Sequence, residues 1–133
     1  MADLKLLLVD DELEFLEPLC TRLGRRGVAC TVTLSGEEAL KALAAGQFDC
    51  AVVDVKMPGM DGLELLRRMR RDFPGTAVVL LTGHASVELG VQGMELGAFD
   101  YLLKPIDLDE LLDTVRRAAA QPARIEGPDR SRM

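Results

Sequence analysis

The amino-acid sequence predicts an α/β fold with a doubly wound parallel sheet. Strand-like and helix-like segments alternate five times along the chain, which is the order of repeated β-α-β units. The strand-like segments are short, uninterrupted apolar runs, as expected for strands that are buried on both faces. The chain has 133 residues, of which 48% are hydrophobic, so it can form one domain with a substantial core.

The first unit is expected to combine a strand at residues 5–9 with a helix at residues 12–25. The apolar residues of this helix share one face: Leu13, Leu16, Cys20 and Leu23. Pro18 removes one backbone donor and should bend the first half of the helix, and Gly27 ends the unit.

The second unit begins with a strand at residues 28–34. Ser35 and Glu38 have the spacing of a capping box, which predicts a helix that continues to residue 45. Gly46 then stands where a left-handed residue is expected to close the helix.

The third unit has a strand at residues 49–53 that delivers Asp54 to a loop. Asp61 is placed to cap a helix at residues 62–72, and Pro74-Gly75 stops it. The last two units are expected, as strand, helix, strand and helix, at residues 77–81, 86–96, 99–103 and 108–120.

Thr82 ends the fourth strand, and Asp107 is the expected cap of the fifth helix. We expect residues 1–120 to form one domain. Residues 121–133 are polar and contain two prolines, which predicts a disordered C-terminal tail or the start of a linker.

Acidic residues end two of the expected strands, Asp10 and Asp11 the first and Asp54 the third. Ligand sites of doubly wound folds lie at the carboxyl edge of the sheet, so neighbouring strands would bring these carboxylates together. Carboxylates at that range repel one another unless a cation lies between them. Mg²⁺ is the expected ion, because it is a hard cation that prefers oxygen ligands. Asp11 or Asp61, taken singly, could instead only cap the next helix, but this does not explain Asp10, Asp11 and Asp54 together with Lys104.

Two more strand ends carry side chains that suit phosphoryl transfer, Thr82 and Lys104. A carboxylate such as Asp54 can act as a nucleophile toward phosphorus and form an acyl phosphate. The Thr82 hydroxyl and the Lys104 ammonium can hold phosphoryl oxygens while negative charge develops on them. We therefore expect Asp54, Thr82 and Lys104 to carry the chemistry.

Four runs of residues occur in one order and spacing over about residues 4–120. The runs are Val9-Asp10-Asp11-Glu12, Asp54-Val55-Lys56-Met57-Pro58-Gly59-Met60-Asp61-Gly62, Leu81-Thr82-Gly83 and Tyr101-Leu102-Leu103-Lys104-Pro105. Together they resemble the response-regulator receiver domains of bacterial two-component signalling, in particular receivers of the nitrogen-regulation type. The resemblance implies a flavodoxin-like (βα)5 fold with strand order 2-1-3-4-5.

The resemblance also implies a role for each site residue. Asp54 would be the phosphoacceptor, and Mg²⁺ would be bound directly by Asp11 and Asp54, mainly through water by Asp10, and by the backbone carbonyl of Lys56. Lys104 would bind the phosphoryl group and precede a cis bond to Pro105. Thr82 and Tyr101 would form a switch pair.

As a receiver, the chain would be a signalling switch and not an enzyme, since it would catalyse only its own phosphorylation and dephosphorylation. The implied partners are a sensor histidine kinase and a downstream output domain or protein, the latter bound by the face of helix four, strand five and helix five. A homodimer could form on phosphorylation. The net charge of −6 argues against direct nucleic-acid binding, and Arg67-Arg68 with Arg70-Arg71 is expected on a solvated helix face.

Three other functions use similar features. A Mg²⁺-dependent phosphohydrolase of the haloacid-dehalogenase type also forms an aspartyl phosphate, but it needs an acid where this chain has Lys56. A flavodoxin-like electron carrier needs aromatic residues around the flavin, yet the chain has no tryptophan and one tyrosine. A degenerate receiver would lack part of the acidic pocket, which is complete here.

The three cysteines, Cys20, Cys30 and Cys50, form no metal-binding pattern and are expected to be small, buried and reduced. No apolar stretch reaches the ~18 residues that span a membrane. The first residues lack the apolar core of a signal peptide. We therefore expect a cytoplasmic protein without a membrane partner.

Overall fold

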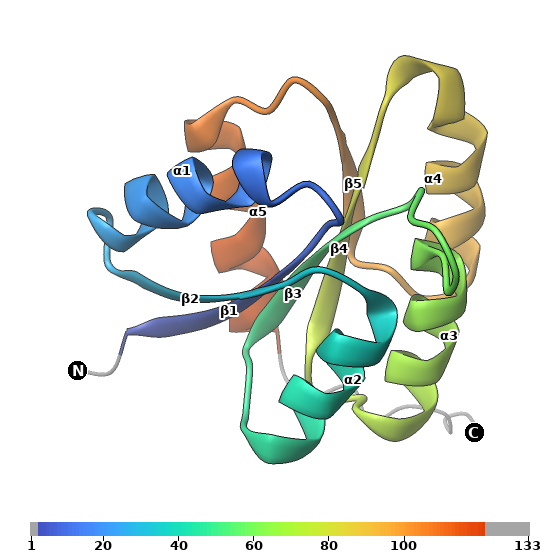
Figure 1. Cartoon of the computed structure of the whole chain (residues 1–133), viewed down its shortest axis with the longest axis horizontal. Coiled ribbons are helices and arrows are strands. Elements are labelled where there is room, and N and C mark those ends of the chain that lie inside the picture. The colour runs from blue at the N-terminus through green and yellow to red at the C-terminus, as the bar shows by residue number, and fades with distance from the viewer. Residues whose placement is uncertain (1–2, 122–133) are drawn as a thin grey trace.

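A computed structural model describes residues 3–121 and has the predicted α/β architecture. Its five strands form one parallel sheet in the order β2-β1-β3-β4-β5, which confirms the predicted topology (Figure 1). The strands are β1 (Leu4–Val9), β2 (Val28–Thr33), β3 (Cys50–Asp54), β4 (Ala77–Thr82) and β5 (Asp100–Leu103). The helices are α1 (Leu13–Gly24), α2 (Gly36–Ala45), α3 (Gly62–Asp72), α4 (Val87–Glu95) and α5 (Leu108–Ala120), with a short 3₁₀ turn, η1 (His84–Ser86), before α4.

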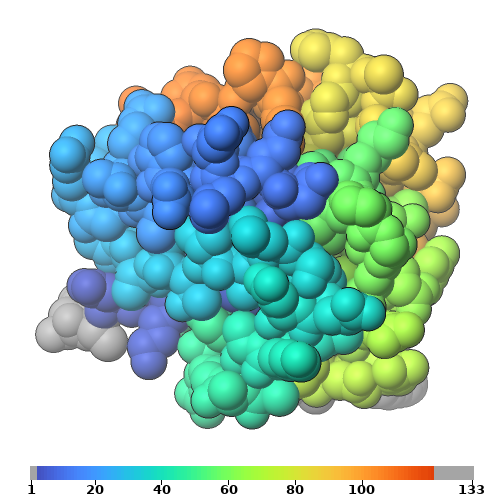
Figure 2. Space-filling view, viewed as in Figure 1, coloured from blue at the N-terminus to red at the C-terminus, as the bar shows by residue number. Residues whose placement is uncertain are grey.

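Helices cover both faces of the sheet, with α1 and α5 on one side and α2, α3 and α4 on the other (Figure 1). Side chains of β1 alternate between two apolar clusters. Leu6 and Leu8 pack with the α1 and α5 side, whereas Leu7 and Val9 pack with the opposite side, and all four are fully buried. In the space-filling view, atoms of the helices and loops cover most of the sheet (Figure 2). The central strands β3 and β4 and most of β1 are therefore apolar, because both of their faces are core, whereas the edge strands β2 and β5 also carry polar residues.

Side-chain caps fix the start of three helices, as the sequence predicts. The Ser35 hydroxyl accepts a hydrogen bond from the Glu38 N–H at 3.1 Å. Asp61 accepts one from the Glu64 N–H at 2.9 Å, and Asp107 accepts one from the N–H two residues later at 3.0 Å. Such caps satisfy backbone donors that have no partner inside the helix.

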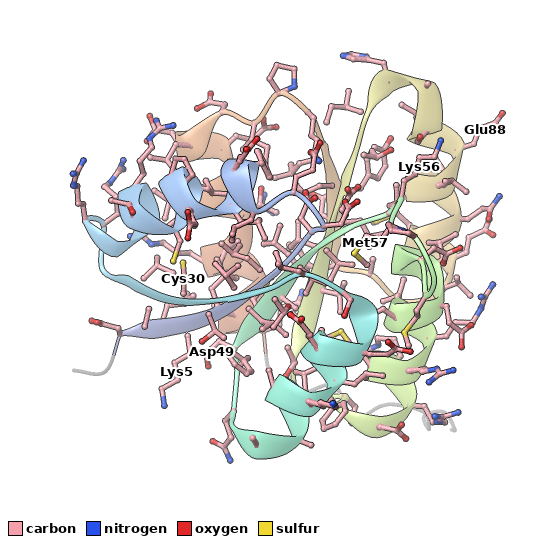
Figure 3. All side chains as sticks on the ribbon, in the orientation of Figure 1. Lys5, Cys30, Asp49, Lys56, Met57 and Glu88 are labelled. Carbon is pink, nitrogen blue, oxygen red and sulfur yellow. The ribbon has the colours of Figure 1, made fainter. Side chains whose placement is uncertain are left out.

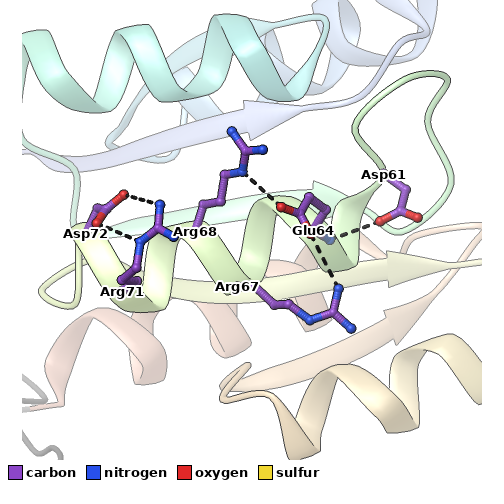
Figure 4. A network of polar contacts seen from close by, with 6 residues as sticks. All are labelled: Asp61, Glu64, Arg67, Arg68, Arg71 and Asp72. Carbon is purple, nitrogen blue, oxygen red and sulfur yellow. Dashed lines mark hydrogen bonds and ion pairs between the residues drawn. The ribbon is translucent and has the colours of Figure 1, made fainter.

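The Arg cluster of α3 forms a solvated helix face, as expected. Glu64 lies 2.9 Å from Arg68 and 3.5 Å from Arg67, and Arg71 pairs with Asp72 at 3.0 Å (Figure 4). These acids offset much of the local positive charge, and the pairs are exposed, so each contributes little to stability.

Three expectations about local structure are wrong. Gly46 ends α2 with φ of −153°, in extended backbone, and its N–H donates to the Ala42 carbonyl, so no left-handed residue closes the helix. Leu13 is 41% exposed and lines a surface groove, and Leu19 instead joins Leu16 and Leu23 on the buried face of α1. Pro18 lies inside α1, which continues through it, and the bend expected there stays a prediction.

The third concerns the cysteines, which are all free thiols. Only Cys50, on a central strand, is buried; Cys20 and Cys30 are half-buried because they lie between α1 and the edge strand β2. No helix among residues 3–121 has the length and apolar character needed to cross a membrane.

Candidate functional site

The strand register brings the predicted site residues to the carboxyl edge of the sheet. Val9 is paired with Val53, so Asp10 and Asp54 follow on neighbouring strands. Thr82 and Lys104 extend the same edge, where the Lys104 N–H donates to the Thr82 carbonyl at 2.9 Å. Figure 3 shows Lys56 and Met57 just beyond β3, with Lys5 and Asp49 at the opposite end of the sheet. The sheet alone therefore positions four of the predicted groups.

Three carboxylates converge in this pocket, as predicted. Asp10, Asp11 and Asp54 each offer an oxygen, and these oxygens lie within 4.8 Å of one another. Asp10 is fully buried, Asp54 is 8% exposed, and Asp11 is exposed. A set of oxygen donors with one member open to solvent suits a hard divalent cation that keeps part of its water shell. The residues therefore fit Mg²⁺.

Lys104 is held against two of these carboxylates. Its Nζ lies 3.0 Å from Asp10 Oδ2 and 3.6 Å from Asp54 Oδ2, and 4.7 Å from the centre of the Phe15 ring. Burial opposes the charged ammonium, but the hydrogen bond and the charge of Asp10 outweigh it and raise the pKa of Lys104. Lys104 is therefore a fixed positive charge at neutral pH, as its predicted role requires.

The environment of Asp54 disfavours the ionised form of its carboxylate. Burial is the main cause that raises the pKa of Asp54, and the charge of Asp10 acts in the same direction. The Lys56 N–H, which donates to Asp54 Oδ1 at 3.2 Å, and the Lys104 ammonium oppose the shift without cancelling it. A buried carboxylate short of compensating charge favours an arriving cation or a change that spreads its charge.

Thr82 lies at the carboxyl edge of the sheet, but its hydroxyl donates a hydrogen bond to the start of α4. The side chain is fully buried, and Oγ1 donates to the Ser86 carbonyl at 2.8 Å, with the Gly83 carbonyl at 3.2 Å. Because Ser86 ends η1, this bond ties the end of β4 to the start of α4. The structure thus shows Thr82 in a position where its hydroxyl holds α4.

Tyr101 of β5 packs against α4. Its ring covers Gly90, where a Cβ atom would lie only 2.9 Å from Tyr101 Cγ. Gly93 approaches Leu80 of β4 still more closely, so a side chain on Gly93 would clash with Leu80. The two glycines of α4 are therefore packing positions that let the helix lie close to β4 and β5.

Sequence reasoning did not identify three contributors to the site: Phe15, Gly62 and the Ser86 carbonyl. The Lys104 ammonium lies over the face of the Phe15 ring, and this cation–π contact stabilises the cation. A Cβ on Gly62 would overlap the Asp54 carbonyl oxygen, so only glycine fits against the backbone of the central acid. The run Asp61-Gly62 after the loop was the available signal for that close approach.

Comparison with known proteins assigns the family. The family described as "Response regulator receiver domain" matches residues 6–116, which is most of the chain. The chain belongs to the response regulator receiver family. This confirms the resemblance of the four sequence runs, and it makes the chain a phosphorylation-based signalling domain of two-component systems.

Relatives and solved structures agree with this assignment. The chain is 40% identical over 110 residues to the DNA-binding transcriptional regulator NtrC of Escherichia coli, covering 83% of this chain and 24% of NtrC. It is 37% identical over 113 residues to the transcriptional regulatory protein FixJ of Bradyrhizobium diazoefficiens, covering 85% of this chain and 55% of FixJ. The chain thus spans about a quarter to a half of the length of these curated relatives.

Among solved structures, the receiver domain of NtrX from Brucella abortus superimposes with a TM-score of 0.83 at 28% identity, covering 88% of this chain and 99% of that one. FixJ-N superimposes with a TM-score of 0.84 at 30% identity, covering 92% and 98%. These neighbours confirm the flavodoxin-like receiver fold.

Proposed function

We propose that this receiver accepts a phosphoryl group on Asp54 from a sensor histidine kinase and relays that event through α4. The observation that carries the proposal is the placement of Asp54 beside Asp10, Asp11 and the Lys104 ammonium in one pocket. We further infer that residues 1–120 form the receiver domain. Nothing in the site favours the phosphohydrolase alternative, since Lys56 stands where that chemistry needs a second acid.

The proposed reaction is a transfer between two nucleophiles. An Asp54 carboxylate oxygen attacks the phosphorus atom, the bond from phosphorus to the kinase imidazole nitrogen breaks, and that nitrogen keeps the electron pair. Asp11, Asp54 and the Lys56 carbonyl would hold Mg²⁺ directly, with Asp10 acting mainly through water, and the ion would supply positive charge to the incoming phosphoryl group. Hydrolysis by water later returns the carboxylate and inorganic phosphate, so the chain acts as an enzyme only on itself.

Lys104 is placed to bind the phosphoryl group once it is on Asp54, because its ammonium already lies beside Asp10 and Asp54. In the present structure its ammonium is nearer to Asp10 than to Asp54. A phosphoryl group on Asp54 replaces the single carboxylate charge with three terminal oxygens that share about two negative charges. Lys104 Nζ already lies 3.6 Å from Asp54 Oδ2, so the ammonium can bind one of these oxygens without leaving the site.

Thr82 and Tyr101 are the proposed switch. To hold a phosphoryl oxygen, the Thr82 hydroxyl must release the Ser86 carbonyl, which frees the start of α4. The Tyr101 ring, which now rests on Gly90, can then take a new position as α4 shifts. Each step exchanges one contact for another, and the few kcal/mol involved suit a two-state switch.

The proposed partner surface is the face of α4, β5 and α5. It exposes apolar side chains that nothing in residues 3–121 covers: Val91 (48% exposed), Met94 (40%) and Leu103 (37%). The relatives named NtrC and FixJ are described as transcriptional regulators and extend beyond the matched region. We propose that this face contacts an output domain, or a second copy after phosphorylation. A cytoplasmic location and a disordered tail, which lies outside the described residues, remain predictions.

Phosphorylation is tested directly by mass. The full chain is incubated with acetyl phosphate and Mg²⁺, and the intact mass should rise by one phosphoryl group. Chelation of the metal, or the Asp54→Asn change, should abolish the gain. The matched control is Asp49→Asn, which removes an exposed aspartate at the opposite end of the same sheet and should be phosphorylated normally (Figure 3). Phosphorylated Asp54→Asn protein would show that the acceptor is misassigned.

A further inference from the structure

Two half-buried thiols face each other across α1 and β2, away from the phosphorylation pocket. Cys20 lies in the second half of α1, and its Sγ is 3.8 Å from the backbone carbonyl oxygen of Cys30 on β2. The Cys20 side chain is also near enough to the Cys30 thiol to raise its pKa. Figure 3 shows Cys30 on the edge strand β2, and α1 and β2 are in extensive contact.

We propose that Cys20 and Cys30 are a redox modification site, in which a peroxide oxidises the two thiols to an intramolecular disulfide that ties α1 to β2. This inference goes beyond the proposed phosphorylation and does not depend on it. A disulfide has an S–S distance of about 2.05 Å, and Cys20 Sγ already lies 3.8 Å from the backbone of Cys30, so the two sulfurs need only a short approach.

The two thiols differ in their access to solvent and in the environment of the sulfur. Cys20 lines the surface groove that also contains Leu13, Pro18 and Val32, so a small oxidant can reach it from solvent. Burial raises the pKa of the Cys30 thiol to about 12, and the neighbouring Cys20 thiol adds to the shift. Cys30 is therefore protonated at neutral pH, and Cys20 is the thiol that meets the oxidant first.

The chemistry balances with hydrogen peroxide as the oxidant. The Cys20 sulfur attacks one peroxide oxygen, the O–O bond breaks, and water leaves with the Cys20 proton to give a sulfenic acid. The Cys30 sulfur then attacks the Cys20 sulfur, the S–O bond breaks, and a second water leaves with the Cys30 proton. Two thiols and one peroxide thus become one disulfide and two waters.

The third cysteine is an internal negative control. Cys50 is fully buried on β3, and burial raises the pKa of its thiol to about 12. It shares neither the groove nor the contact of the other two. Under conditions that oxidise Cys20 and Cys30, Cys50 should stay reduced.

Peptide mapping of the full chain tests the proposal. Reduced protein is treated with hydrogen peroxide, free thiols are blocked with N-ethylmaleimide, and the protein is cut with trypsin without reduction. Because Arg22, Arg25 and Arg26 separate the two cysteines, the disulfide should appear as residues 6–22 joined to residues 27–41. The linked pair should be ~2 Da lighter than the sum of its two reduced peptides, through loss of two hydrogens. The peptide with Cys50 should carry the blocking group.

Variants separate this disulfide from unspecific oxidation. Cys20→Ser and Cys30→Ser should each abolish the linked peptide, whereas Cys50→Ala should retain it. Hydrogen exchange should slow in α1 after oxidation of the wild type but not of Cys30→Ser. The proposal would be overturned if, after peroxide treatment, the peptides with Cys20 and Cys30 each carried N-ethylmaleimide, or if the disulfide joined two protein molecules. The wild-type map decides even if a variant folds poorly.

Discussion

The contact between Gly90 and Tyr101 makes α4 sensitive to one methyl group. An alanine Cβ at position 90 would lie 2.9 Å from Cγ and 3.0 Å from Cδ1 of the Tyr101 ring. Carbon atoms pack best at about 3.5–4.0 Å, so the ring or the helix must move by about half an ångström. Tyr101 is only half-buried, so its ring is the group that can give way.

Two effects of Gly90→Ala oppose each other. Alanine is favoured over glycine inside a helix by about 1 kcal/mol, while overpacking of a close contact costs about 1–3 kcal/mol. We expect a net destabilisation of about 1 kcal/mol. Gly24→Ala is the matched control, because Gly24 also lies in a helix and its Cβ would meet nothing within 4 Å. That change should stabilise the protein by about 0.4–1 kcal/mol.

Urea unfolding monitored by circular dichroism measures both variants. The chain has one tyrosine and no tryptophan, so its intrinsic fluorescence reports on Tyr101 alone. In Gly90→Ala the native emission should become more accessible to a quencher such as acrylamide, whereas Gly24→Ala should match the wild type. If Gly90→Ala stabilises the protein as much as Gly24→Ala does, with unchanged quenching, the described packing of Tyr101 on α4 is wrong.

Substitutions of Asp54, Asp11, Asp10 and Thr82 test the pocket. Because the pKa of Asp54 is raised in the folded state, its ionised form opposes folding. Without Mg²⁺, Asp54→Asn should therefore melt above the wild type at pH 7, and the gap should close as the pH falls toward the unfolded-state pKa of about 3.9. A pH series of melting curves checks this, and a gap that widens in acid would contradict it. Asp11→Asn should raise the Mg²⁺-free melting temperature by relieving repulsion among the carboxylates. Asp10→Asn should lower it because it breaks the ion pair with Lys104. A rise in both variants would show that relief of repulsion outweighs this ion pair. Thr82→Val loses the 2.8 Å hydrogen bond to the start of α4 and should destabilise the protein by about 1 kcal/mol in urea, with Thr82→Ser close to the wild type. Equal stability of the two Thr82 variants would exclude a role for that bond.

Much of the fold could be predicted because local signals and topology agree. Caps such as Asp61 and Asp107 fix where helices begin, and each observed helix and strand lies within a residue of its expected range. The carboxyl edge of a parallel sheet then brings Asp10 and Asp54 together without further information. Their individual roles in phosphoryl transfer are predictions.

What the sequence could not predict depends on contacts between distant segments. Periodicity placed Leu13 on the buried face of α1, but the first residue of that helix faces a groove instead. From the sequence, the two glycines of α4 indicated only low helix propensity. In the structure, Gly90 leaves space for the Tyr101 ring and Gly93 leaves space for Leu80. The direction of the Thr82 hydroxyl likewise depends on a carbonyl four residues away, which no sequence pattern encodes.

Hydrogen exchange with and without beryllofluoride, which mimics the aspartyl phosphate, tests most directly whether Asp54 controls α4. We predict fast exchange at residues 86–96 in the free protein, since α4 contains two glycines and begins at a single Thr82 hydrogen bond. On binding, the largest change should occur there and near Tyr101, and Asp54→Asn should show none. If α1 or α2 responds most while α4 stays protected throughout, the proposed path from Asp54 to α4 is wrong.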